Sequence, residues 1–86
     1  MAKKNQLREA IAANVVKILR EKRNQRGLSM NQVAERSGLS QSMISLVEHD
    51  LRNPTLDTLL RIADALEIDL SEVIKSASNT VRSEQK

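Results

Sequence analysis

The chain has 86 residues and a formal net charge of +3, and it contains no cysteine, phenylalanine, tyrosine or tryptophan. One small domain is expected at this length, and the lack of cysteine excludes disulfide scaffolds, thiolate nucleophiles and cysteine-ligated zinc or iron–sulfur sites. The lack of aromatic residues excludes the base-stacking platforms of single-strand binders, and the single histidine, His49, excludes a histidine-based metal site within one chain.

The first predicted helix spans residues 6–26, where apolar residues recur three or four positions apart on one stripe. Gly27 is expected to end it in a left-handed conformation. Residues 1–28 carry a charge of +6, whereas residues 55–76 carry −3. This asymmetry indicates a molecule with one end suited to polyanions, although a well-solvated helix would have a similar composition.

A second helix is predicted over residues 30–37 and a third over residues 41–49, joined by a short turn that contains Gly38. Ser29 and Gln32 have the spacing of a capping box, and Ser40 is expected to cap the third helix. Two short helices joined by a tight turn with glycine are the pattern of a helix-turn-helix motif.

A fourth helix is predicted from a Thr55 cap to residue 67, and a short fifth helix over residues 70–77 with Asp69 and Glu72 as a capping box. The fourth helix is expected to bury a stripe made of Leu56, Leu59, Leu60, Ala63 and Leu66. The predicted fold class is therefore all-α, with one domain over residues 1–77 and a polar, disordered tail over residues 78–86.

The outward face of the third helix is small, polar and almost uncharged, unlike a face that only meets water. It consists of Gln41, Ser42, Ser45, Leu46 and His49. Small side chains allow a helix backbone to approach base edges closely. Gln41 can offer adenine a hydrogen-bond donor and an acceptor at once, and a serine hydroxyl can donate or accept one hydrogen bond. This pattern favours DNA recognition over a plain solvated helix, which stays open as the alternative.

Residues 19–74 resemble the Cro and phage-repressor type of helix-turn-helix domain, also called the xenobiotic-response-element family. The matching segments are LREKRNQRGLSMNQVAERSGLSQSMISLVE and RNPTLDTLLRIADALEIDLSEVI. The resemblance implies a compact five-helix, lambda-repressor-like fold with the third helix in the major groove. It also implies binding as a symmetric homodimer to a palindromic operator.

The resemblance assigns roles to individual positions. The expected base readers are Gln41, Ser42 and Leu46, with Ser45 beside them. The expected phosphate contacts are Asn31, Gln32, Ser40, Arg52 and Asn53. Arg23 and Glu48 match a partly buried salt bridge that ties the first helix to the third. The dimer surface is expected on Leu70, Val73 and Ile74 of the fifth helix, or on an extension of the first helix.

Four features depart from the family pattern. Met30 stands where a glutamine usually contacts phosphate, so a neighbouring side chain is expected to take that contact. Leu46 is apolar at a reading position and either touches a thymine methyl group or packs. Asp50 replaces a glycine after the third helix, which predicts a less tight helix end. The first helix also starts about two turns early, and Leu7 and Ile11 there need a partner surface.

The sequence thus predicts a cytoplasmic, sequence-specific transcriptional regulator, a repressor or autoregulator, that binds double-stranded DNA as a homodimer. Lysine and arginine side chains of the first helix are expected to contribute phosphate contacts. No enzyme activity is predicted, because no catalytic motif frames the serine, histidine and aspartate residues. No cofactor or metal is predicted either, and no membrane association is expected because no apolar run approaches the roughly 18 residues of a membrane span. A chain of this length gives no argument for a small-molecule ligand. A restriction–modification controller is a subtype of this prediction.

Two other functions stay open. An antitoxin of a toxin–antitoxin pair would bind DNA in the same way and also hold a protein partner, but the short polar tail offers little surface for one. A helical protein-interaction module without DNA function is the second alternative, and the uncharged outward face of the third helix argues against it.

Overall fold

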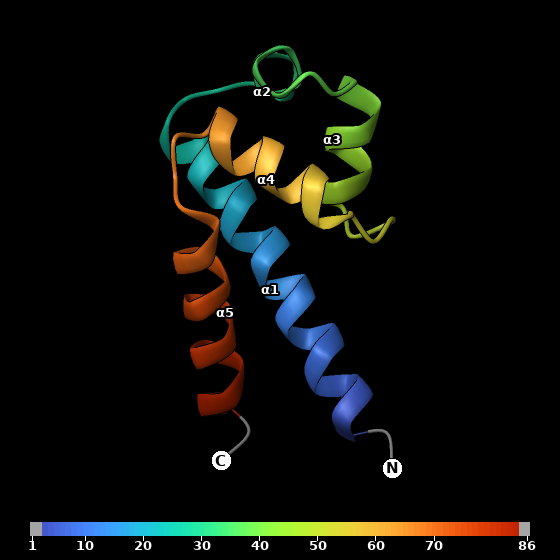
Figure 1. Ribbon diagram of the computed structural model, residues 1–86, viewed down its shortest axis with the longest axis vertical. Coiled ribbons are helices and arrows are strands. Elements are labelled where there is room, and N and C mark those ends of the chain that lie inside the picture. The colour runs from blue at the N-terminus through green and yellow to red at the C-terminus, as the bar shows by residue number, and fades with distance from the viewer. Residues whose placement is uncertain (1–2, 85–86) are drawn as a thin grey trace.

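Five helices follow one another along the chain in the predicted order. In the computed structural model, which describes residues 3–84, they are α1 (Lys3–Gln25), α2 (Met30–Ser37), α3 (Gln41–Glu48), α4 (Leu56–Ala65) and α5 (Leu70–Glu84). Figure 1 shows α2 and α3 together at one end of the molecule, with α4 beneath them. The long helices α1 and α5 lie side by side and are antiparallel, since α1 leads toward that end and α5 leads away from it. The predicted all-α fold class is confirmed.

Serine caps begin the two helices of the helix-turn-helix as predicted. The Ser29 hydroxyl accepts from the Gln32 N–H at 3.0 Å, while the Gln32 side-chain oxygen accepts from the Ser29 N–H at 2.8 Å. The Ser40 hydroxyl accepts from the Met43 N–H at 3.0 Å. These bonds satisfy amide groups that have no partner within their own helix, so they fix where α2 and α3 begin.

The caps of the last two helices differ from each other. Thr55 caps α4 as predicted, because its hydroxyl oxygen accepts from the Thr58 N–H at 3.1 Å. The Asp69 carboxylate accepts from the N–H and the hydroxyl of Ser71, at 3.0 and 2.8 Å. The predicted pairing of Asp69 with Glu72 is wrong, since the carboxylate reaches the nearer serine.

Four helices end with one left-handed residue followed by an apolar residue. The left-handed residues are Gly27, Gly38, Asp50 and Glu67, with φ angles between 57° and 75°. The apolar residues that follow them are Leu28, Leu39, Leu51 and Ile68. Each apolar residue donates its N–H to the carbonyl oxygen five residues earlier, at 2.9–3.1 Å. This is the Schellman turn, so the expectation of a less tight end after α3 is wrong.

The core is aliphatic and draws on all five helices, as the lack of aromatic residues requires. It consists of Val15, Val16, Leu19, Val33, Ala34, Ile44, Val47, Ile62, Ala63, Ala65, Leu66, Leu70, Val73 and Ala77. The predicted stripe of α4 is only partly right. Leu56 and Leu60 are 63% and 49% exposed, because α4 turns Ile62 and Ala65 inward in their place.

The last helix is longer than predicted. α5 continues through Glu84, and Val81 is buried, so the expectation of a disordered tail is wrong for residues 78–84. Residues 85–86 lie outside the described residues. Figure 1 shows the last turns of α5 beside the first half of α1. Ile11 packs against the core, so its partner surface lies within the protomer, and Leu7 is also partly buried.

Candidate nucleic-acid interface

The outer face of α3 is presented to solvent while its inner face is anchored in the core. Ile44 and Val47 are each 1% exposed. Gln41 and Ser42, in the first turn, are exposed, and Leu46 is partly buried. The predicted base-reading side chains therefore stand on a helix whose position is fixed from below, and Leu46 lies between the outer face and the core.

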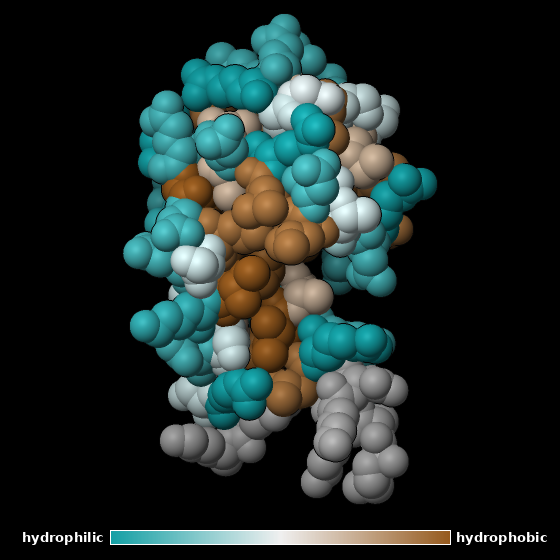
Figure 2. All heavy atoms as spheres, viewed as in Figure 1, coloured by the Kyte–Doolittle hydropathy of each residue, from teal (hydrophilic) through white to brown (hydrophobic). Residues whose placement is uncertain are grey.

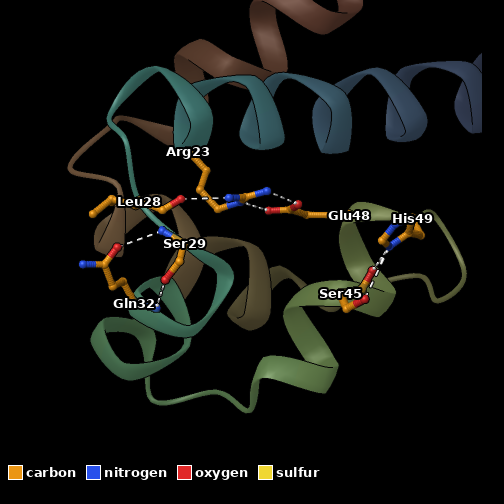
Figure 3. Close-up of polar contacts among 7 residues, drawn as sticks. All are labelled: Arg23, Leu28, Ser29, Gln32, Ser45, Glu48 and His49. Atoms are coloured by element: carbon orange, nitrogen blue, oxygen red, sulfur yellow. Dashed lines mark hydrogen bonds and ion pairs between the residues drawn. The ribbon is translucent and has the colours of Figure 1, made fainter.

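His49 packs against the predicted reader Ser45 at the end of α3 (Figure 3). Its Nδ1 lies 2.8 Å from the Ser45 carbonyl oxygen and 3.4 Å from the Ser45 hydroxyl oxygen. With the proton on Nδ1, the ring donates to that carbonyl and helps to close the last turn of the helix. His49 thus caps the last turn of α3.

Three predicted phosphate contacts lie at the starts of α2 and α3, where backbone N–H groups favour anions. Asn31, Gln32 and Ser40 are all exposed. The side-chain oxygens of Gln32 and Ser40 are used as acceptors in the caps described above. Their donor groups, an amide NH₂ and a hydroxyl proton, are the atoms that suit a phosphate oxygen.

The other two predicted phosphate contacts lie in the α3–α4 loop, residues 49–55. Arg52 and Asn53 are both exposed there. Asn53 also lines a groove between this loop, α1 and α5. The loop therefore borders two surfaces, the one that carries α3 and the one between the long helices.

The predicted salt bridge between α1 and α3 forms with bidentate geometry (Figure 3). Arg23 Nε lies 2.6 Å from Glu48 Oε2, and Nη2 lies 2.9 Å from Oε1. Arg23 Nη1 also donates to the Leu28 carbonyl oxygen at 2.8 Å. The two charged side chains are only 13% and 7% exposed, so each charge depends on the other to neutralise it. This pair fixes the C-terminal end of α3 relative to α1.

Arg61 is a positioning residue that the sequence analysis missed. Its Nε donates to Asp57 Oδ2 at 2.8 Å, and its Nη1 donates to the Ser37 carbonyl oxygen at the end of α2, at 3.3 Å. The hydrogen bond with Asp57, aided by its charge, raises the pKa of Arg61. The four-residue spacing of Asp57 and Arg61 was readable from the sequence, but their link to the helix-turn-helix was not.

The basic residues of α1 do not all lie on one surface that DNA could contact. Arg23 is used inside the protein, and Arg26 lies 3.7 Å from the Glu67 carboxylate. Arg8 lines the groove between α1 and α5. The charge of +6 in the first third of the chain therefore overstates the positive charge that α1 can offer to DNA.

The residues predicted for a dimer surface differ in exposure. Leu70 and Val73 are each 5% exposed and fill the protomer's own core. Ile74 is 39% exposed. Of the three, Ile74 alone has a side chain that a second molecule could cover without rearranging the core.

The part of the chain over residues 3–84 brings together no group of three or more histidine or acidic side chains suited to hold a metal ion. None of its helices has the length and apolar character needed to span a membrane.

Comparison with known proteins places this geometry in a family. A family model described as helix-turn-helix matches residues 19–73. An uncharacterized HTH-type transcriptional regulator of Sinorhizobium fredii, y4dJ, is 35% identical over 74 residues, which are 86% of this chain and 91% of that protein. The immunity repressor protein of Bacillus phage phi105 is 40% identical over 52 residues, which are 60% of this chain and 36% of the repressor.

Two solved structures share the fold. The restriction-modification controller protein C.AhdI from Aeromonas hydrophila is 37% identical with a TM-score of 0.68, and the match covers 72% of this chain and 94% of that one. A variant of the controller protein C.Esp1396I has a TM-score of 0.72 at 24% identity, over 78% of this chain and 87% of that one, and its likeness concerns the fold alone.

Proposed function

Because the chain belongs to the Cro/C1-type helix-turn-helix family of DNA-binding transcriptional regulators, we propose that it binds a palindromic operator as a homodimer and represses transcription or regulates its own gene. The observation that carries this proposal is the outer face of α3. Gln41 and Ser42 are exposed there on a helix that the core, a buried salt bridge and two caps hold in place.

Recognition has two parts in this proposal. Exposed donors of Asn31, Gln32, Ser40, Arg52 and Asn53, together with backbone N–H groups at the helix starts, contact phosphates. Among these donors Arg52 carries a positive charge, so its contact makes the binding weaken as salt rises. These contacts set the orientation of α3 but do not distinguish sequences.

Sequence is read by the first turn of α3 and the residues that follow it on the same face. Gln41 can form two hydrogen bonds with the N6 and N7 edge of adenine, and Ser42 and Ser45 can donate or accept. Leu46, which is partly buried, can contact a thymine methyl group from its exposed side.

The homodimer supplies the remaining specificity. Two copies related by a two-fold axis would place two α3 helices in successive major grooves, about 34–36 Å apart along the duplex. A repressing or regulating role agrees with the names of two relatives, a phage immunity repressor protein and a restriction-modification controller protein.

The test is a fluorescence anisotropy titration of a labelled random duplex in a series of salt concentrations. The proposal predicts binding whose logarithmic affinity falls linearly with the logarithm of salt concentration. A protein-interaction module without DNA function would show no salt-dependent binding at any concentration, and that result would overturn the proposal.

A further inference from the structure

Leu51 is the exception among four equivalent residues. Each Schellman turn places an apolar side chain directly after its left-handed residue, where it usually packs against the preceding helix or the core. Leu28, Leu39 and Ile68 do pack against the hydrophobic core. Leu51 is instead 72% exposed, so the turn after α3 holds a large apolar side chain out in water.

Other apolar surface is exposed on α4 and α5. Leu56 and Leu60 of α4 are 63% and 49% exposed, and Ile74 of α5 is 39% exposed. Figure 2 shows apolar side chains gathered over α4 and continuing down between α1 and α5. Contiguous apolar surface of this kind marks an interaction site in proteins that are otherwise covered by charge.

A groove lies beside the same loop that carries Leu51. It has a volume of about 700 Å³ and is bordered by the first half of α1, the α3–α4 loop, α4 and α5. Its apolar lining consists of Ile11, Ala12, Val15, Val16, Leu59 and Ile74. Its charged lining consists of Arg8, Glu9 and Asp50, and thus has both signs.

We propose that two copies of this chain pair about a two-fold axis so that Leu51 of each copy packs into the groove of the other. This inference rests on the proposed homodimer and names the surface that forms it. A two-fold interface must be complementary to itself, and here a protruding leucine and an apolar groove lie on either side of one loop.

The charges around the groove favour a second copy over a small anionic ligand. One arginine and two acidic residues give the lining a net negative charge, which disfavours an anion. In a two-fold pair, by contrast, Arg8 of each copy can face an acidic residue of the other. The contact would also bury the exposed part of Ile74.

The first test is sedimentation equilibrium of the full chain and of Leu51→Ser. Each dimer loses two buried leucine side chains in the variant, so we expect the dimer dissociation constant to rise about a hundredfold. Because Leu51 is mostly outside the protomer core, the thermal unfolding of the monomer should not change. Equal dissociation constants for the two proteins would overturn the proposal.

The second test uses disulfide formation, which the lack of native cysteine makes specific. A mixture of Leu51→Cys and Ala12→Cys is oxidised, and we expect a disulfide between the two different chains. The matched control replaces Ala12→Cys by Glu21→Cys, since residue 21 is about 180° around α1 from residue 12. Equal cross-linking at both positions, or none at Ala12, would contradict the proposed contact.

The two proposals fail in distinguishable ways. If the wild-type protein binds DNA and sediments as a dimer, but the Leu51→Cys and Ala12→Cys variants form no disulfide with each other, the surface is overturned and the homodimer is left intact. A wild-type protein that remains monomeric, free and on DNA, would overturn the homodimer and the surface together.

Discussion

The bidentate pair of Arg23 and Glu48 is the residue-scale contact that most directly positions α3. Glu48→Gln leaves the buried guanidinium without its counter-charge, so we expect a loss of about 3–5 kcal/mol in the free energy of unfolding. Urea denaturation measures this loss. Glu67→Gln, which breaks the exposed pair with Arg26, is the control and should cost no more than about 1 kcal/mol. Similar losses for both variants would contradict the structural role of the buried pair.

Glu67 has a left-handed backbone with a φ of 59°, and substitutions there measure what this conformation costs in the free energy of unfolding. A residue other than glycine in the left-handed conformation costs about 1–2 kcal/mol. Glycine removes this strain, but it also loses more backbone entropy on folding, which offsets part of the gain. We therefore expect Glu67→Gly to raise the free energy of unfolding by about 0.5–1 kcal/mol. Glu67→Ala removes the same carboxylate but keeps the strain. If the alanine and glycine variants were equally stable, this explanation of the helix end would fail.

Gln41 is the residue whose role is purely one of reading in the proposed function. Gln41→Ala should lose about 1–3 kcal/mol of discrimination at one base pair in each half-site, because its paired hydrogen bonds to a base disappear. Non-specific binding should be nearly unchanged, since phosphate contacts supply it. Competition binding with single-base variants of a selected operator measures both. An unchanged base preference would show that Gln41 does not read the sequence.

At the scale of elements, packing between α1 and α5 stabilises the outer turns of both helices. Val81 is 4% exposed in a segment that has no other apolar residue between positions 78 and 84. Val81→Ala should lower the free energy of unfolding by about 1–3 kcal/mol, because it removes buried methyl groups. Thr80→Ala, at an exposed neighbour, is the control in the same urea denaturation experiment. Equal stability of both variants and the native chain would mean that the last turns contribute nothing.

The caps that begin α2, α3 and α4 were the most predictable features, because local chemistry determines them. Ser29, Ser40 and Thr55 cap the helices that their spacing predicted. The continuation of α5 was not predictable in this way, since serine, asparagine and threonine are weak helix formers and packing on α1 overrides them. The exposed side of α4 was also missed, because its leucines follow helical spacing whether a protomer or a partner buries them.

In the candidate site, the position of a side chain was predictable where it depends only on the helix that carries the residue. The outward position of Gln41 and Ser42 follows from helical spacing alone. The contact of Arg61 with the carbonyl oxygen of Ser37 could not be found this way, because it depends on how α4 packs across the end of α2. The exposure of Leu51 could not be found from spacing either, because equivalent residues after the other helices pack against the core.

At the scale of the whole molecule, the distribution of positive charge sets the affinity for phosphate more than the net charge of +3 does. Arg52 is exposed in the α3–α4 loop and is available for this role. Arg52→Ala should weaken binding to all sequences alike and reduce the slope of log affinity against log salt by about 0.9 for each bound copy. Titrations at several salt concentrations measure this slope. A loss confined to one base pair would instead identify Arg52 as a base reader.

The central claim is that two copies of this chain read a two-fold symmetric DNA site through α3. Selection of bound sequences from a random duplex library, with the native full chain, tests this claim most directly. We predict enrichment of a palindrome whose half-sites lie about one helical turn apart, 10–10.5 base pairs from centre to centre. Enrichment of an asymmetric single site, or of no sequence at all, would contradict it.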